Sequence, residues 1–569
     1  MSAIKAREFD DILEAVGSFG RYQKLRIAFF FIPAAVFFGF SSVSYVFEMV
    51  VPPHWCHVPG RENTTLTPDE WKSLTIPPIE GSSDKYASCL MYDGFWEVEN
   101  DSYIYTITNT TSECVHGWEY DRSQFSETFP SEVDWVCTYK DYAPHTLSIN
   151  VVGRALGTLL LPLLADNYIG RRRMFFLAVG TYVVFTIPLH WIYSAPLTFL
   201  FRFLNGIGYE TNYLMPYVIM MEIIPPSRRD LVVMMTFVSW TVGICITSVV
   251  AWLVGNWRPL NILTIVPFVC LFAYWRVLPE SPRWLLSKGR LRECADILLQ
   301  IGASNGASKV SREEVEEELR ALTIRLPPNE PLTRAFVHPK LRLRAIMLYV
   351  LSCTQFIVYG VILMSMSVMP GNYFVSHLVL SVFEIPSAFV GLAVTHYFGR
   401  RFLGYSSLLL GALCFVAAPF CVHNKWLLLG VLAVAKLSCT CTLYLVFLLP
   451  AEILPTPVRT SGAGLVVVSG MLGMTLSPQL LHSGMGEGMH YWVLLAITGV
   501  GMISLFPIPE TLGLIMPQTF KESEELGTGR PLTTWIHHWN LHKYPGTPQH
   551  EDEDDGKDEE RHLVNGKEC

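Results

Sequence analysis

Long apolar stretches separated by short polar turns dominate the chain. A helix needs about 20 mainly apolar residues to cross a bilayer, and twelve stretches meet this requirement. They lie at 27–50, 142–165, 174–193, 196–221, 231–254, 257–278, 345–368, 374–397, 402–422, 426–449, 461–482 and 489–508. The pattern predicts an all-α, multi-pass membrane protein with twelve transmembrane helices in two six-helix halves. Their number and length argue against buried helices of a large soluble protein.

Positive charge alternates between the loops. Arginines occupy 171–173, 228–229 and 400–401, whereas 194–196 and 369–373 hold no Lys or Arg. By the positive-inside rule, the arginine loops and both termini are expected on the cytoplasmic side. The predicted organisation is a cytoplasmic N-terminus (1–26), a six-helix half (27–278) with a large extracellular loop after the first helix (52–141), a cytoplasmic central loop (279–344), a second half (345–508) and a cytoplasmic tail (509–569).

The composition agrees with this interpretation. Of the 569 residues, 51% are hydrophobic and only 16% are charged, against roughly 25% charged in a typical soluble domain. Many of the acidic residues that contribute to the net charge of −8 lie in the run EDEDDGKDEER at 551–561. This run is expected to be a solvated, disordered end. No signal peptide pattern is visible, so targeting is expected to come from the first membrane segment.

Three motifs occur twice, at an offset of 229 or 230 residues. IGRRR (169–173) matches FGRRF (398–402), MEIIPPSRR (221–229) matches AEILPTPVR (451–459), and LPESPRW (278–284) matches IPETLG (508–513). A constant offset indicates that the two halves are structural repeats. Each motif falls at a predicted cytoplasmic helix end.

We interpret these motifs as a gate. Arginines beside a helix end can pair with a carboxylate or with a helix C-terminus when the cytoplasmic side is closed. Glu222 with Arg229, and Glu452 with Arg459, are candidates to supply the carboxylates. The predicted gating residues are Asp166, Gly170, Arg171, Arg172, Glu222, Arg229, Gly399, Arg400, Arg401, Glu452 and Arg459. The alternative is that the arginines only fix the topology.

These motifs resemble the major facilitator superfamily, whose cytoplasmic loops carry Gly-Arg-Arg after helices 2 and 8. PESPRWLLSKGR (279–290) and the loop sequence CVHGWEYDRSQFSETFPSEVDWVC (114–137) are similar to the solute carrier 22 family of organic cation, anion and zwitterion transporters. The resemblance implies transport of a small organic solute. The chain departs from the pattern in two places: one extra residue separates Asp166 from Gly170, and His396 replaces the acidic residue of the second copy.

The loop at 52–141 contains four cysteines and three glycosylation sequons. Disulfides persist and sequons become glycosylated outside the cell, so both are expected here. Four cysteines allow three pairings. The cysteines are Cys56, Cys89, Cys114 and Cys137, and the sequons begin at Asn63, Asn100 and Asn109. No metal site is expected. Cys439 and Cys441 are two residues apart on a helix and point to different faces, so they are not expected to bind one metal ion together.

Few ionisable residues fall inside the predicted spans, where they are costly and usually functional. The sequence interpretation identifies Arg154, Arg202, Glu210, Glu384 and Lys436. Arg202 lies in FRFLNGIG, which resembles a structural motif of the superfamily, and is expected to have a structural or proton-coupling role. Glu384 and Lys436 have no charged neighbour in sequence, so each is expected to find a partner across the bundle, and a Glu384–Lys436 pair is one candidate.

The resemblance also implies a substrate site. Aligned by neighbouring motifs, Tyr359, Glu384, Trp240, Asn212 and Tyr213 match positions that line the family's cavity; plain helix packing is the alternative for the aromatic residues. An aromatic wall with a carboxylate suits a quaternary ammonium. Position 471, where cation transporters of the family carry Asp and anion transporters often carry Arg, is Met here. The predicted substrate-binding residues are Glu384, Tyr359, Trp240, Asn212, Tyr213, Lys436 and Met471.

The sequence therefore favours a plasma-membrane secondary transporter of small organic zwitterions or cations, with carnitine-like betaines first. Alternatives are an organic anion transporter of the same family, or a non-transporting receptor or scaffold with the same fold. HExxH and Walker A motifs are absent from the sequence, which argues against a metalloprotease-type enzyme and an ATP-driven pump. No cofactor is expected beyond coupling to Na⁺ or H⁺. The expected partners are a small organic solute and the lipid bilayer, with no nucleic acid.

Overall fold

The computed structural model describes the helical body of the chain and most of its large loop. The described residues are 9–17, 19–63, 66–78, 86–99, 102–225, 228–306, 311–325, 332–365, 371–455, 458–482, 488–512, 514, 517 and 519–527. The sequon residue Asn100 and the acidic run at 551–561 lie outside them.

The described residues of the twelve predicted stretches are predominantly helical. Ten described helical segments are long and apolar enough to cross a membrane. The stretch at 196–221 is divided between α8 (Ala195–Tyr209) and α9 (Thr211–Ile223), which meet at Glu210. The last stretch forms the shorter apolar helix α22 (Met489–Ser504).

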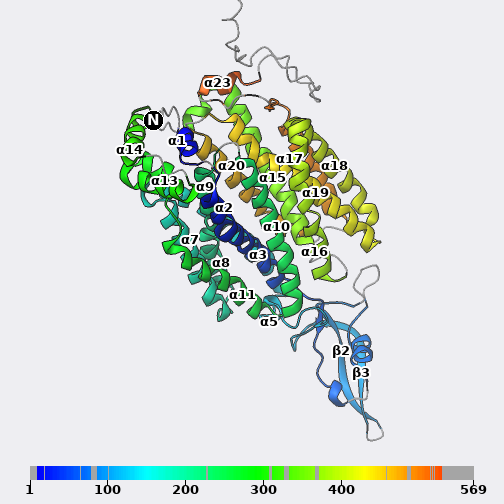
Figure 1. Ribbon diagram of the computed structural model, residues 1–569. Helices are drawn as coiled ribbons and strands as arrows, with labels where there is room; N and C mark the ends of the chain where they lie inside the picture. The colour runs from blue at the N-terminus through cyan, green and yellow to red at the C-terminus, as the bar shows by residue number, and fades with distance from the viewer. Residues whose placement is uncertain are drawn as a thin grey trace, which may run out of the picture.

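The helices form two successive groups (Figure 1). The first contains α2 (Arg21–Arg26), η1 (Ile27–Phe31), α3 (Ile32–Glu48), α6 (Tyr142–Leu164), η4 (Ala165–Ile169), α7 (Arg171–Thr186), η5 (Ile187–His190), α8, α9, α10 (Arg229–Val254), α11 (Trp257–Leu271) and η7 (Phe272–Arg276). The second contains α15 (Pro339–Met364), α16 (Tyr373–Val382), α17 (Ile385–Tyr397), α18 (Arg400–Cys421), α19 (Lys425–Ile453), α20 (Arg459–Met474), α21 (Ser477–Leu481) and α22.

The two ends of the bundle carry different additions (Figure 1). We call the end that carries Arg171 and Arg400 the arginine end and the opposite one the β end. The arginine end holds α1 (Phe9–Ala15), α12 (Pro282–Ser287), α13 (Leu291–Asn305), α14 (Arg312–Arg325), η8 (Leu332–Phe336) and α23 (Phe520–Glu525). The β end holds β1 (His54–Cys56), η2 (Arg61–Asn63), α4 (Pro68–Thr75), β2 (Leu90–Glu99), β3 (Ser102–Glu113), β4 (Trp118–Tyr120), α5 (Phe129–Glu132) and η3 (Cys137–Tyr139).

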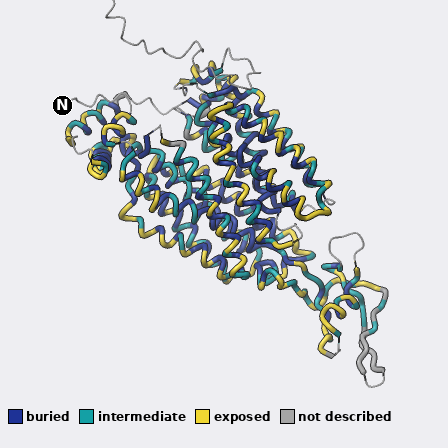
Figure 2. The backbone as a smooth tube through the Cα atoms, turned by 45° about the vertical axis from the view of Figure 1, so that its right-hand side comes forward, coloured by how far each residue is buried: buried dark blue, intermediate teal, exposed yellow. Residues whose placement is uncertain are grey.

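Buried and exposed residues alternate along the helices of the bundle (Figure 2). Many of the exposed residues are large and apolar: Leu163 is 46% exposed, Leu253 71%, Leu413 58% and Ile503 71%. Apolar exposure on this scale marks an interaction surface, and on helices of this length it suits contact with lipid.

The loop at the β end is built from two antiparallel pairs of strands, β1 with β4 and β2 with β3. Two disulfides join its segments, Cys56 to Cys114 and Cys89 to Cys137. The structure thus selects one of the three pairings that the sequence left open. Of the predicted glycosylation sites, Asn63 ends η2 and Asn109 lies in β3.

At the arginine end, the first copy of the repeated motifs ties three segments of the first half together. The Glu280 carboxylate accepts hydrogen bonds from the backbone N–H groups of Arg171 (2.8 Å) and Arg172 (3.1 Å) at the start of α7. A carboxylate at a helix N-terminus is favoured by the free N–H groups and by the helix dipole. The Arg171 guanidinium pairs with Glu222 at 3.4 Å, and Ser281 donates to the same carboxylate.

The second copy repeats this arrangement. Glu510 accepts from the backbone N–H groups of Arg400 (3.0 Å) and Arg401 (2.9 Å), while Arg400 pairs with Glu452 at 2.7 Å. Thr511 donates to Glu452 as Ser281 does to Glu222. Both arginine–glutamate pairs join helices of the same half, so neither bridges the two halves.

The extra residue of the first motif is absorbed by a π-helix. The segment η4 ends with an i→i+5 hydrogen bond from Gly170 N to Ala165 O (2.9 Å), and a π-turn takes up one residue more than an α-turn. Asp166 therefore still reaches Arg171, at 3.2 Å. In the second copy His396 replaces the aspartate, and Arg400 donates instead to the Thr395 carbonyl (3.1 Å).

Both motif glycines are required by the geometry. Gly170 and Gly399 have φ of 91° and 99°, a conformation that L side chains rarely adopt. A Cβ at either position would lie 2.4 Å or 2.7 Å from the carboxylate oxygen of Glu280 or Glu510, respectively. The capping carboxylate can approach the helix start only because no side chain is present.

We therefore expect Gly399→Ala to destabilise the protein by about 1–3 kcal/mol, the usual cost of a strained backbone. The matched control is Gly430→Ala in α19, where a Cβ meets no atom within 4 Å. Thermal unfolding of the purified protein should show a lower transition temperature for Gly399→Ala than for Gly430→Ala. Equal transition temperatures would contradict this description of the motif.

Candidate functional site

Contacts between the two halves concentrate at the β end. Ser248 Oγ on α10 lies 2.7 Å from His377 Nδ1 on α16. Ser148 Oγ on α6 lies 2.6 Å from the Thr475 carbonyl at the end of α20. Helix α6 of the first half packs against α20 and α21 of the second half. Helix α10 packs against α16 and α17.

The large loop adds to this closure. The Gln124 side chain donates to the Gly371 carbonyl (2.7 Å) and accepts from Tyr373 N (2.9 Å), which lie where α16 begins in the second half. Phe125 packs against Phe374 with ring centroids 4.8 Å apart. The loop itself is held to the first half by Ser126, Glu127 and Asn256 around the α10–α11 turn.

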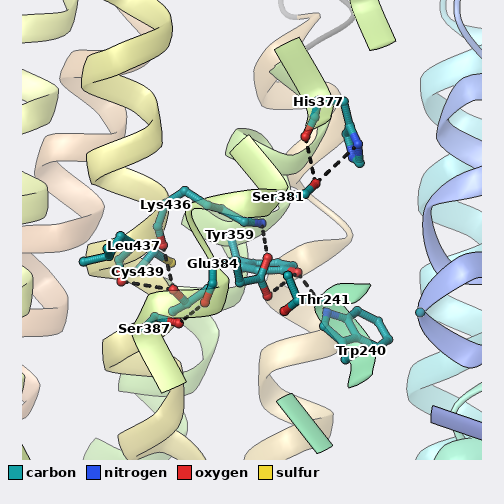
Figure 3. Close-up of polar contacts among 12 residues, drawn as sticks. Trp240, Thr241, Tyr359, His377, Ser381, Glu384, Ser387, Lys436, Leu437 and Cys439 are labelled. Atoms are coloured by element: carbon teal, nitrogen blue, oxygen red, sulfur yellow. Dashed lines mark hydrogen bonds and ion pairs between the residues drawn. The ribbon is translucent and has the colours of Figure 1, made fainter. Parts of the chain in front are cut away.

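A buried ion pair lies in the second half, between α19 and the junction of α16 with α17 (Figure 3). Lys436 Nζ on α19 is 3.5 Å from Glu384 Oε2. Their exposed fractions are 1% and 4%. Glu384 lies at the break between α16 and α17, where Pro386 has no N–H to continue the helix. The pair that the sequence suggested as one candidate is therefore formed.

Tyr359 on α15 connects this pair to an aromatic cluster. Its hydroxyl donates to Glu384 Oε1 (3.3 Å) and its ring lies under the Lys436 ammonium, with Nζ 3.4 Å from the centroid. Trp240 Nε1 on α10 donates to the Tyr359 hydroxyl at 3.4 Å, across the boundary between the halves (Figure 3). Trp240 and Tyr359 thus link the two halves at the level of the charged pair.

The aromatic cluster continues into the first half. Tyr213 on α9 stacks on Phe38 with ring centroids 4.9 Å apart and lies 6.5 Å from Trp240. Phe38 also packs against Trp240 at 5.0 Å. A continuous set of aromatic faces therefore leads from α9 to the Glu384–Lys436 pair.

Asn212, beside Tyr213, is buried without a hydrogen-bond partner. It is 2% exposed, and neither its amide oxygen nor its amide nitrogen forms a hydrogen bond within the described residues. An unsatisfied buried amide costs roughly 1–3 kcal/mol. Such a group requires a specific explanation, and a solute or water that binds to it would supply one.

The structure places four of the seven predicted substrate-binding residues in direct contact: Trp240, Tyr359, Glu384 and Lys436. Tyr213 joins them through ring packing. Met471 is buried in α20, and the described polar contacts of the ion pair do not involve that helix. The role of all seven in binding remains a prediction.

A buried charge inside a predicted span was not predicted from the sequence. Glu48 lies within the predicted span 27–50, is 1% exposed, and pairs with Arg202 at 2.6 Å. Asn261 donates to its other carboxylate oxygen at 3.0 Å. An acidic residue inside an apolar stretch is the sequence signal that could have identified Glu48.

A second pair lies beside the first. Arg154 is 3.5 Å from Glu210, donates to Asn150 (2.9 Å) and lies over the Tyr209 ring at 3.9 Å. The cavity lined by Arg154, Asn150 and Tyr209 together with Glu48 and Arg202 measures about 10 Å³, room for about one water molecule. The charged cluster of the first half is thus closed to a solute and holds α3, α6, α8 and α11 together.

Among the predicted gating residues, Glu222 and Glu452 pair with Arg171 and Arg400, as described above. Arg459 does not contact Glu452: it donates to the Leu454 and Pro517 carbonyls at 3.2 and 3.0 Å. The Arg229 side chain lies outside the described part of the structure. Glu280 and Glu510 were not predicted as functional residues from the sequence, although their repetition at the common offset was a signal for them.

Comparison with known proteins identifies the family. The model of the family "Sugar (and other) transporter" matches residues 103–524. Organic cation transporter 1 of Caenorhabditis elegans is 26% identical, covering 93% of this chain and 90% of the relative. The beta-alanine transporter of Drosophila melanogaster is 28% identical, covering 91% and 89%. Organic cation/carnitine transporter 2 of Mus musculus is 27% identical, covering 91% and 94%.

A solved structure shows the same fold. The xylose transporter XylE from E. coli, in a partially occluded inward open conformation, superposes with a TM-score of 0.56 at 15% identity, covering 85% of this chain and 97% of that chain. A related solved structure is described as belonging to the major facilitator superfamily. The chain therefore belongs to the sugar (and other) transporter family and has the major facilitator fold of a membrane transporter, not of an enzyme.

Proposed function

We propose that this protein is a secondary transporter that moves small organic zwitterions, carnitine-like betaines first and simple organic cations second, by alternating access. The observation that carries the proposal is the buried Glu384–Lys436 pair beside the Tyr359 ring. The substrate preference follows from the charge and chemistry of this site.

The charge of the site argues for a zwitterion. Glu384 and Lys436 together are neutral, so an added cation leaves one excess positive charge and an added anion one excess negative charge. A zwitterion leaves the site neutral. An uncompensated charge at the centre of a membrane helix costs at least about 2.5–3.5 kcal/mol, so the neutral combination is favoured.

The aromatic faces argue for an ammonium group without N–H donors. Aromatic rings attract quaternary ammonium ions, and desolvated contacts contribute about 2 kcal/mol or more. Relatives are named for organic cations, carnitine and beta-alanine. Carnitine and beta-alanine each carry an ammonium and a carboxylate, which agrees with the neutral pair in this chain.

The proposal includes a location and an orientation. The protein is a multi-pass plasma-membrane protein, with both termini and the arginine end in the cytoplasm and the β end outside. In that orientation the contacts of Ser248, Ser148 and Gln124 close the outer side. These contacts must break when the site opens outward, and rearrangement of the arginine clusters accompanies that change. Transport is coupled to a Na⁺ or H⁺ gradient.

Uptake by cells expressing the protein tests the function. Labelled carnitine, glycine betaine, choline and benzoate are compared, each with and without sodium and at two external pH values. We expect the betaines to be carried best. Uptake of benzoate alone would contradict the proposal in favour of an organic anion transporter, and no uptake of any compound would favour a receptor or scaffold.

Glu384→Gln should reduce betaine uptake at least tenfold, which corresponds to about 1.4 kcal/mol, because the carboxylate that pairs with the ammonium is lost. The matched control is Glu293→Gln on α13, a surface glutamate whose side chain is 54% exposed; its uptake should equal that of the wild type. Surface biotinylation corrects for the amount of protein at the membrane. Normal transport by Glu384→Gln would remove Glu384 from the site.

The orientation predicts which segments are accessible on intact cells. An epitope inserted near Asn63 should be labelled without permeabilisation, whereas one placed at 551–561 should require it. Glycosidase should reduce the apparent mass, and the triple substitution of Asn63, Asn100 and Asn109 by Gln should abolish that change. Labelling of the tail on intact cells would contradict the proposed orientation of the protein.

A further inference from the structure

The position of the Lys436 side chain points beyond a simple ion pair. Its ammonium lies 3.4 Å from the centroid of the Tyr359 ring and 3.5 Å from Glu384 Oε2. A ring face within about 6 Å and a carboxylate are the two features that bind an organic ammonium. Lys436 therefore occupies the place that the proposed function assigns to the positive group of the substrate (Figure 3).

The Lys436 ammonium is also poorly satisfied there. It is 1% exposed, yet Nζ donates no hydrogen bond within the described residues, and Glu384 Oε2 accepts none. An ammonium has three N–H donors, and leaving them unused inside a protein is costly. In the Glu48–Arg202 pair of the first half, by comparison, both carboxylate oxygens of Glu48 accept hydrogen bonds, from Arg202 and from Asn261.

We propose that Lys436 is a tethered occupant of the cation site, and that its displacement by the carboxylate of the substrate makes the protein select zwitterions over simple cations. This inference rests on the proposed function and assigns Lys436 a specificity-determining role within it. In the structure the lysine holds the site closed by filling it with a cation of its own.

The exchange of partners explains the selectivity. A betaine brings an ammonium, which takes the place over Tyr359 beside Glu384, and a carboxylate, which gives the displaced Lys436 ammonium a partner. One ion pair becomes two, and no charge is left alone. Choline has the same trimethylammonium group as glycine betaine, with an uncharged hydroxymethyl group in place of the carboxylate. It can enter only by moving Lys436 away without offering it a counter-charge.

Substitution of Lys436 by Met tests this displacement directly, because methionine is long, flexible and uncharged. The probes are labelled glycine betaine and choline, which differ in the carboxylate. Wild type should carry betaine in preference to choline. Lys436→Met should carry choline at least tenfold faster than wild type, because the cation site is then empty and Glu384 has no counter-charge. Its betaine uptake should fall at least tenfold.

Two further variants control the interpretation. Lys436→Arg keeps a tethered cation and should keep the preference for betaine. The double variant Glu384→Gln/Lys436→Met removes both charges and should lose the gain in choline uptake, since that gain requires the carboxylate. Surface biotinylation measures the amount of each variant at the cell surface. If Lys436→Met does not reach the membrane, Lys436→Gln is used in its place.

The outcomes separate this inference from the proposed function. If wild type carries betaine but Lys436→Met and Lys436→Gln reach the surface without gaining choline uptake, the tethered occupant is wrong and the proposed function stands. A gain in choline uptake that persists in the double variant would also overturn the inference. If wild type carries neither betaine nor choline, the proposed function itself fails.

Discussion

Charge inside the hydrocarbon layer must be neutralised, and this constraint shapes the centre of the molecule. Ionisable groups in a membrane helix are costly unless they pair or contact water. The described spans meet this requirement with three buried pairs: Glu48 with Arg202, Arg154 with Glu210, and Glu384 with Lys436. Each pair joins different helices, so neutralisation and helix packing are achieved by the same contacts.

The pairs of the two halves are not equivalent. In the first half, asparagine side chains and a tyrosine ring supplement the ion pairs. The enclosed cavity has room for about one water molecule. In the second half, Glu384 and Lys436 retain unused hydrogen-bonding capacity beside an aromatic wall that spans the boundary between the halves. The first arrangement suits a scaffold, and the second suits a site that exchanges partners.

The sequence predicted the elements of the structure more completely than their contacts. Apolar length located all twelve helical stretches, and the constant offset of the motifs revealed the repeat. Charge inside the apolar stretches indicated Glu384 and Lys436, but pairing depends on helix rotation, which hydropathy does not report. The π-helix at η4 compensates an inserted residue through backbone geometry, and the choice among three disulfide pairings depends on the strand register. Such features follow from tertiary packing and have no local signature.

A zwitterion that binds as proposed separates Glu384 from Lys436 and gives each of them a new partner. A structure of the protein with glycine betaine bound tests this exchange. We expect the trimethylammonium group within about 6 Å of the Tyr359 ring centroid, beside Glu384, with the betaine carboxylate at hydrogen-bonding distance from Lys436 Nζ. A bound structure in which Lys436 still lies over the Tyr359 ring, with the betaine held elsewhere, would show that no such exchange takes place.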